Sequence, residues 1–150
     1  MRIQKSSPQR KAATTVEFAV VCIPLFLFLF GIYEYGRFVF TLQVMENSAR
    51  EGARYAIVHT YDPTVAADTI AKVREHLAGV DVSAFGAPAT ITVYAADNSG
   101  TNLGSPLNAP FGTFIGVRIQ GGYRTAVPNL LLMSDVIQMD TRTLMNSEAN

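Results

Sequence analysis

The most pronounced hydrophobic pattern in the chain is an uncharged apolar run near its N-terminus. Residues Phe18 to Tyr33 read FAVVCIPLFLFLFGIY. Extended to the range Thr14 to Phe40, the segment would form a helix of about 40 Å at about 1.5 Å per residue. That length crosses a hydrocarbon core of about 30 Å with some tilt. Because the run is apolar on all sides, it predicts a membrane-spanning helix rather than an interfacial one.

The polar pattern beyond the apolar run predicts that the same helix continues outward. No helix breaker occurs from Gln43 to Val58, and the pairs Glu46/Arg50 and Glu51/Arg54 have the spacing of ion pairs on one helix. We therefore expect one helix from Thr14 to Val58, about 65 Å long. Its outer half carries a stripe of mostly small side chains that would pack against another element: Val44, Ser48, Ala49, Ala53, Ala56 and Ile57.

A second, amphipathic helix is predicted over Pro63 to Ala78. Asp62 is the expected N-cap, Pro63 lies in the first turn, and Gly79 is the expected C-cap. Apolar residues follow at helical spacing: Ala66, Ile70, Val73 and Leu77.

Three strands are predicted after this helix. Alternating patterns cover Thr90–Tyr94, Ile115–Gln120 and Val136–Leu144. The segment Ala96–Gly112 is rich in Asn, Gly, Ser and Pro and is expected to be a loop without secondary structure.

Two short segments near the second and third strands have their own patterns. The pair Gly121-Gly122 is expected at a bulge or turn. The apolar run Leu130–Met133, which follows Pro128, has two interpretations: a helical turn that caps the core, or an exposed contact surface.

The charge distribution gives the apolar helix an orientation. Although the formal net charge is zero, the residues before Ala13 include no acid and four cations: Arg2, Lys5, Arg10 and Lys11. By the positive-inside rule this end is cytoplasmic. The sequence thus predicts a cytoplasmic basic leader (residues 1–13), a transmembrane helix (14–40) and an extracytoplasmic domain (41–150). A cleaved signal peptide is disfavoured, because its apolar region is usually about 7–15 residues long and Gly31–Tyr35 is a poor cleavage site.

The candidate chemistry of the chain lies at the two membrane edges. Glu17 is at the cytoplasmic edge and has no basic partner at helical spacing, whereas Glu34 and Arg37 are three residues apart near the outer edge and can pair. Ionisable residues in a membrane segment are functional candidates. The lone cysteine, Cys22, is interpreted as a small hydrophobe. The sequence has no glycine-rich phosphate loop and no metal-ligand cluster, so we expect no cofactor, no metal and no enzyme activity. The neutral balance gives no reason to expect nucleic acid as a partner.

Three motifs together resemble the N-terminal signature of TadE-like proteins. They are Val16-Glu17-Phe18 before the apolar span, Glu34-Tyr35-Gly36-Arg37 after it, and AREGARYA at Ala49–Ala56. The resemblance implies a minor pilin or pseudopilin of a bacterial tight-adherence (type IV-like) pilus assembly and secretion system. It also implies a pilin-like fold, with a long N-terminal helix against a small antiparallel sheet. The helix signature residues would be Glu34, Gly36, Arg37, Arg50, Glu51 and Arg54.

The resemblance further implies an assembly role for the N-terminal region. Processing by a prepilin peptidase would fall between Ala12 and Ala13, although Ala12 stands where such processing usually follows glycine. Glu17 would then be the fifth residue of the mature chain, where its carboxylate could meet the α-amino group of a neighbouring subunit. The implied partners are the bacterial inner membrane, other pilin-like subunits and an inner-membrane assembly platform.

The sequence therefore predicts an α+β fold and a structural subunit. Gly31 and Gly36, with the small residues of the outer half, would allow close approach of neighbouring helices. Two other functions stay open. A membrane-anchored extracytoplasmic binding module predicts a stable monomer in detergent, and an anchored enzyme predicts a pocket with perturbed titratable groups.

Overall fold

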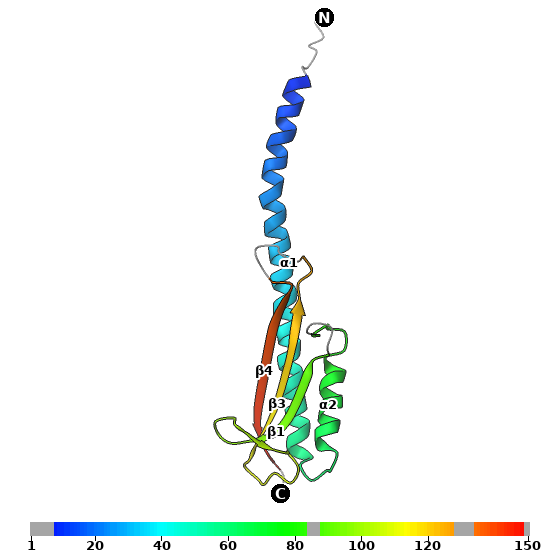
Figure 1. The fold of residues 1–150 in the computed structure, drawn as a ribbon, viewed down its shortest axis with the longest axis vertical. Coiled ribbons are helices and arrows are strands. Elements are labelled where there is room, and N and C mark those ends of the chain that lie inside the picture. The colour runs from blue at the N-terminus through cyan, green and yellow to red at the C-terminus, as the bar shows by residue number, and fades with distance from the viewer. Residues whose placement is uncertain (1–7, 84–87, 128–133, 149–150) are drawn as a thin grey trace, which may run out of the picture.

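One helix runs through most of the length of the molecule (Figure 1). The computed structural model describes residues 8–83, 88–127 and 134–148. Helix α1 spans Pro8–Val58, 51 residues, and continues through Pro24. It begins six residues before the predicted start at Thr14, because Pro8 suits the first turn of a helix, where its missing N–H is not needed. Its N-terminal half stands clear, while its C-terminal half lies against the sheet.

The small-residue stripe of α1 is the side that packs, as predicted. Ala49, Ala53 and Ala56 are fully buried, together with Met45. Gly52 lies on the same side, and a Cβ at this position would be 2.4 Å from Cγ2 of Val73 in the second helix. The lack of a side chain at Gly52 therefore sets how closely the two helices approach.

Helix α2 spans Val65–His76 and is shorter at both ends than the predicted Pro63–Ala78. Its N-cap is Thr64, so the predicted N-cap at Asp62 is wrong. The Asp62 carboxylate instead accepts hydrogen bonds from the Thr64 N–H at 2.9 Å and from the Thr64 hydroxyl at 2.8 Å, which forms a turn before the helix. The C-cap is Leu77, so the predicted C-cap at Gly79 is also wrong; Gly79 lies two residues further on, where it adopts a positive φ of 92°.

In the described part of the chain the sheet has four strands, one more than the sequence predicted. They are β1 (Thr90–Ala96), β2 (Asn102–Gly104), β3 (Phe114–Arg124) and β4 (Val136–Asn146). The order is β2-β1-β3-β4 and all neighbours are antiparallel.

Strand β2 lies inside the segment Ala96–Gly112, which was expected to be a loop without secondary structure. The turn before it explains the difference. The Asp97 carboxylate accepts hydrogen bonds from the N–H groups of Ser99 (2.9 Å) and Thr101 (2.8 Å), and Gly100 has a φ of 82°. This turn reverses the chain, so that Asn102 pairs with Ala96.

The predicted bulge or turn at Gly121-Gly122 is also wrong. Both glycines lie within β3 and pair in unbroken register with Met139 and Gln138 of β4. A Cβ on Gly121 would lie 2.3 Å from the Val82 carbonyl oxygen, which accepts a hydrogen bond from the Gly122 N–H at 3.0 Å. The glycine is needed for close approach of another backbone segment.

The core lies between the covered half of α1, α2 and one face of the sheet. Its buried members include Met45, Val73, Val117, Ile119 and Tyr123. The architecture confirms the predicted fold class, an α+β chain in which a long N-terminal apolar helix packs against a small antiparallel sheet. The apolar run Leu130–Met133 lies outside the described residues, so neither interpretation of it is tested.

Candidate functional site: a carboxylate clamp on the long helix

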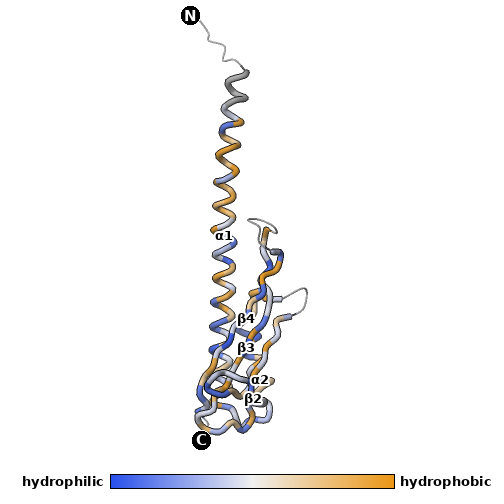
Figure 2. Tube along the Cα trace, turned by 60° about the vertical axis from the view of Figure 1, so that its left-hand side comes forward, coloured by the Kyte–Doolittle hydropathy of each residue, from blue (hydrophilic) through white to orange (hydrophobic). Residues whose placement is uncertain are grey.

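The two halves of α1 have different surroundings, and Glu34 marks the boundary between them. The tube in Figure 2 is mostly orange, and so apolar, along the N-terminal half, and more mixed beside the sheet. Tyr33 and Tyr35 on either side of Glu34 are exposed, whereas Glu34 itself is only 3% exposed. A carboxylate buried to this degree needs hydrogen-bond donors, because its desolvation is otherwise costly.

Those donors come from the far end of the sheet. The Tyr123 hydroxyl, near the end of β3, donates to a Glu34 carboxylate oxygen at 2.5 Å. The backbone N–H of Ala126, just after β3, donates to both carboxylate oxygens at 3.1 Å. Hydrogen bonds to an ionised acceptor are stronger than neutral ones. Glu34 therefore fastens the end of β3 to α1.

Arg37 completes the group, and the predicted pairing with Glu34 is present. Its guanidinium Nη1 lies 3.7 Å from a Glu34 carboxylate oxygen, and the side chain is 40% exposed. The guanidinium carbon lies 5.9 Å from the ring centre of Tyr33 and 5.4 Å from that of Tyr123, within the range of cation–π contact. We call Glu34, Arg37, Tyr123 and Ala126 the Glu34 clamp.

The clamp changes the acidity of its tyrosine. Tyr123 is 1% exposed, and its ring packs edge-on against Phe38 with ring centres 5.5 Å apart. Burial, and then the hydrogen bond to Glu34, raise the pKa of Tyr123 to about 12. The phenol thus keeps its proton at neutral pH and stays a donor to the carboxylate.

The other signature residues do not join the clamp. Arg50 pairs with Glu46 at 3.3 Å, as predicted. Glu51 and Arg54 are exposed, and in the part of the chain that the structure describes no ion pair joins them, so that predicted pairing is wrong. A Cβ on Gly36 would meet nothing within 4 Å, so nothing within this chain requires glycine there.

The candidate residues of the N-terminal region lie at the other end of the apolar half. Glu17 is exposed on α1, and among the described residues it has no hydrogen-bond or ion-pair partner. The backbone at Ala12 and Ala13 is helical. Seventeen positions of helix separate Glu17 from Glu34, about 25 Å at about 1.5 Å per residue.

Sequence reasoning found Glu34 and Arg37 but missed Tyr123 and Ala126. The alternating pattern predicted a strand over Ile115–Gln120, whereas β3 continues to Arg124, so Tyr123 lies beyond the predicted strand. Ala126 contributes through its backbone, which carries no sequence signal.

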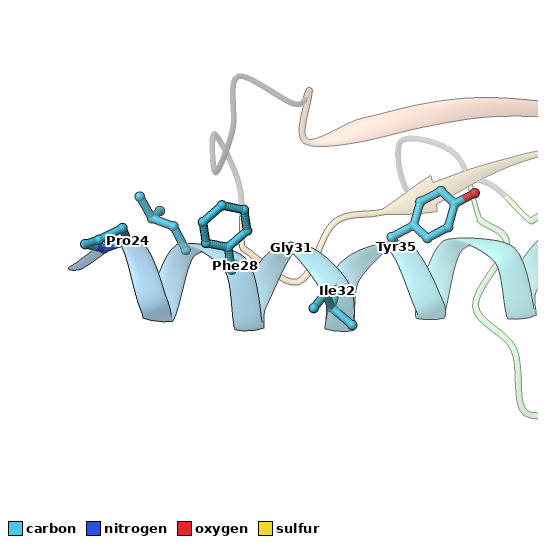
Figure 3. Close-up of a pocket in the computed structure, with 6 residues that line it drawn as sticks. Pro24, Phe28, Gly31, Ile32 and Tyr35 are labelled. Atoms are coloured by element: carbon cyan, nitrogen blue, oxygen red, sulfur yellow. The ribbon is translucent and has the colours of Figure 1, made fainter. Parts of the chain in front are cut away.

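A shallow apolar groove lies on the exposed half of α1, on the N-terminal side of the clamp (Figure 3). It is lined by Pro24, Leu27, Phe28, Gly31, Ile32 and Tyr35. The missing side chain at Gly31 leaves room between Phe28, three positions before it, and Tyr35, four positions after it. Gly31 therefore contributes to the shape of this surface, as the expected close approach of another helix requires.

These features define a class of protein: an α+β chain with a pilin-like arrangement, in which one helix is both the apolar segment and the spine of a small antiparallel sheet. Within the described residues one helix segment, Thr14–Val58, is long and apolar enough to cross a membrane. Residues 12–54 match the model of the TadE-like protein family, which confirms the resemblance of the three motifs. That family is associated with tight-adherence pilus assembly.

The match covers Glu17, Glu34, Arg37 and the AREGARYA motif as far as Arg54, whereas Tyr123, Ala126 and the sheet lie outside it. Searches of curated proteins and of solved structures found no significant match.

Proposed function

We propose that this chain is a structural minor pilin or pseudopilin subunit of a bacterial tight-adherence pilus assembly and secretion system. Residues 14–40 anchor it in the inner membrane, residues 1–13 face the cytoplasm, and residues 41–150 form the extracytoplasmic domain. The observation that supports this most strongly is the continuity of α1, whose apolar half is exposed while its other half is the spine of the sheet domain.

The exposed half of α1 presents an apolar surface that must be shielded from water. Exposed large apolar side chains follow one another from Val16 to Ile32, including Phe18, Phe28 and Leu29. Each such side chain gains about 1.5–3 kcal/mol on leaving water. Lipid covers this surface in the anchored subunit, and helices of other pilin-like subunits replace the lipid on assembly. The groove at Gly31 is a surface that such a helix fits.

The Glu34 clamp gives the sheet domain a fixed position relative to the anchor. A sheet fastened to α1 at Glu34 moves with the helix when the helix is drawn into an assembly. The role of the signature pair Glu34 and Arg37 is therefore structural, and the inner-membrane assembly platform acts on a subunit that behaves as one rigid body.

Glu17 is the proposed assembly residue at the cytoplasmic edge. Cleavage by a prepilin peptidase between Ala12 and Ala13 creates an α-amino group, which pairs with Glu17 of a neighbouring subunit. A carboxylate at the centre of a membrane helix costs about 2.5–3.5 kcal/mol on insertion scales and less at the boundary. Pairing on assembly removes that cost, and this would favour the assembled state.

The topology of the anchor is the first test of the proposal. An alkaline phosphatase reporter fused after Asn150 should be active, because it folds only outside the cytoplasm, and the fusion should stay in the membrane fraction after alkaline carbonate washing. Neutralising Arg2, Lys5, Arg10 and Lys11 together should reduce the fraction of the protein that inserts with its N-terminus in the cytoplasm. Activity of a cytoplasm-dependent reporter at the same position would contradict the proposed orientation.

A further inference from the structure

Within the described residues, the guanidinium of Arg37 has N–H donors without a hydrogen-bond acceptor. Its nearest carboxylate oxygen, on Glu34, is 3.7 Å from Nη1, which is longer than a hydrogen bond. Over the residues that the structure describes, no hydrogen bond runs from this guanidinium to another group. The Glu34 oxygens are already engaged by Tyr123 and Ala126. A guanidinium carries five N–H donors, so the described part of the chain leaves most of its hydrogen-bonding capacity open.

The position of this guanidinium is held by two aromatic rings. Tyr33 and Tyr123 each lie within 6 Å of its central carbon, and the side chain is still 40% exposed. Ring contacts restrain the side chain without occupying its donors. A restrained arginine with free donors suits the planar, two-pronged recognition of a phosphate or carboxylate.

The position of Arg37 along α1 indicates which molecule would supply such an anion. If the bilayer centre lies midway between Glu17 and Glu34, the Arg37 Cα is about 17 Å from it, at about 1.5 Å per residue. The hydrocarbon core ends about 15 Å from the centre, and the headgroup layer extends to about 20–22 Å. With the bilayer centre at this position, Arg37 lies at the depth of the lipid phosphates.

We propose that Arg37, held between Tyr33 and Tyr123, binds the phosphate group of a phospholipid in the outer leaflet. This inference rests on the proposed membrane anchoring. The Glu34 carboxylate approaches the guanidinium at Nη1, and the remaining N–H groups donate to the phosphate oxygens. The bound lipid fixes the depth of the clamp at the membrane surface, and so the height of the sheet domain above the bilayer.

The test uses the full-length protein, labelled with nitrogen-15 arginine, in micelles of a phosphate-free neutral detergent. The side-chain Nε–H signal of Arg37, assigned with Arg37→Lys, is followed while short-chain phosphatidylglycerol or inorganic phosphate is added. We expect a saturable shift with the phospholipid, at a concentration at least about tenfold lower than that of inorganic phosphate needed for the same shift. Arg54, exposed on the same helix and without an ion pair among the described residues, is the matched control and should show no saturable shift.

The outcomes separate this inference from the proposed anchoring. An Arg37 signal that the phospholipid leaves unchanged overturns the lipid site, and so does an equal response to inorganic phosphate, which would indicate a general anion site. Both results leave the anchoring intact as long as the protein co-elutes with micelles. A full-length protein that stays soluble without detergent overturns the anchoring and the lipid site together.

Discussion

The hydroxyl of Tyr123 donates to the Glu34 carboxylate at 2.5 Å, across a separation of 89 positions in the sequence. This contact joins the last turn of the apolar half of α1 to the end of the central strand β3. Among the described residues, the Tyr123 hydroxyl donates to Glu34 alone, and the Glu34 carboxylate accepts hydrogen bonds from Tyr123 and the Ala126 N–H alone. The pair accounts for the glutamate of the Glu34-Tyr35-Gly36-Arg37 motif in physical terms.

Removing the hydroxyl should destabilise the fold. In Tyr123→Phe the buried Glu34 carboxylate loses one donor, which should lower the free energy of unfolding by about 1–3 kcal/mol. Chemical denaturation in detergent, followed by circular dichroism of the sheet, measures this. Tyr94→Phe is the matched control, because Tyr94 is also buried, and in the described part of the structure its hydroxyl has no hydrogen bond. Equal effects of the two substitutions would mean that the contact to Glu34 does not stabilise the protein.

The raised pKa of Tyr123 predicts a loss of stability at alkaline pH. Below pH 10 the phenol is protonated in the folded and unfolded chains, so it adds no pH dependence. Between pH 10 and about 12 the unfolded chain releases this proton while the folded chain keeps it. Ionisation therefore stabilises the unfolded state relative to the folded state, by up to about 2–3 kcal/mol at about 1.4 kcal/mol per pKa unit.

The measurement is the difference in free energy of unfolding between the wild type and Tyr123→Phe as a function of pH. We expect this difference to be constant below pH 10 and to shrink as the pH rises toward 12. A difference that stays constant over this interval would show that the Tyr123 phenol ionises as readily in the folded chain as in the unfolded one.

Substitution by alanine should have opposite effects on stability at Gly52 and at Gly36 of α1. In Gly52→Ala the new Cβ would meet Cγ2 of Val73 at 2.4 Å, so α2 must move away, at a cost of about 1–3 kcal/mol. In Gly36→Ala the new Cβ meets nothing within 4 Å, and alanine favours the helix by up to about 1 kcal/mol. Thermal unfolding of the two variants compares them directly, and similar melting temperatures would count against the close contact of the helices.

Substitution of Glu17 should affect assembly without affecting membrane insertion. Glu17→Gln keeps the size of the side chain and removes its charge, so the variant should insert normally. It should assemble poorly, because the carboxylate is no longer present to pair with an α-amino group. Membrane fractionation and counts of pili on cells measure the two properties. Normal piliation by the variant would reduce Glu17 to a tolerated residue at the membrane edge.

The state of the N-terminus tests the cleavage proposal by itself. Mass spectrometry of the protein from its native host should show a chain that begins at Ala13. An intact N-terminus in a cell that still assembles pili would contradict cleavage between Ala12 and Ala13, and with it the pairing partner proposed for Glu17.

The sequence was sufficient where a pattern is local. The helix through the apolar run, the helical spacing of Ala49, Ala53 and Ala56 and the strand pattern of Ile115–Gln120 each depend on near neighbours. The structure contains the predicted helix, the buried alanines and a strand over that range. The wrong predictions concern segments whose structure depends on residues distant in the sequence. Strand β2 needs the turn built by Asp97, and Gly121 is needed for the approach of Val82. Likewise, Glu34 is predictable as a membrane-edge acid, but its partner Tyr123 is set only by how β3 lies on α1.

Deletion of the gene in its native host, with pili counted by electron microscopy, tests most directly whether this chain is a pilus subunit. The deletion strain should lack tight-adherence pili, the wild-type gene should restore them, and a gene for residues 41–150 with a cleavable signal peptide should not. Undiminished piliation in the deletion strain would contradict the claim that this chain is a subunit required for pilus assembly.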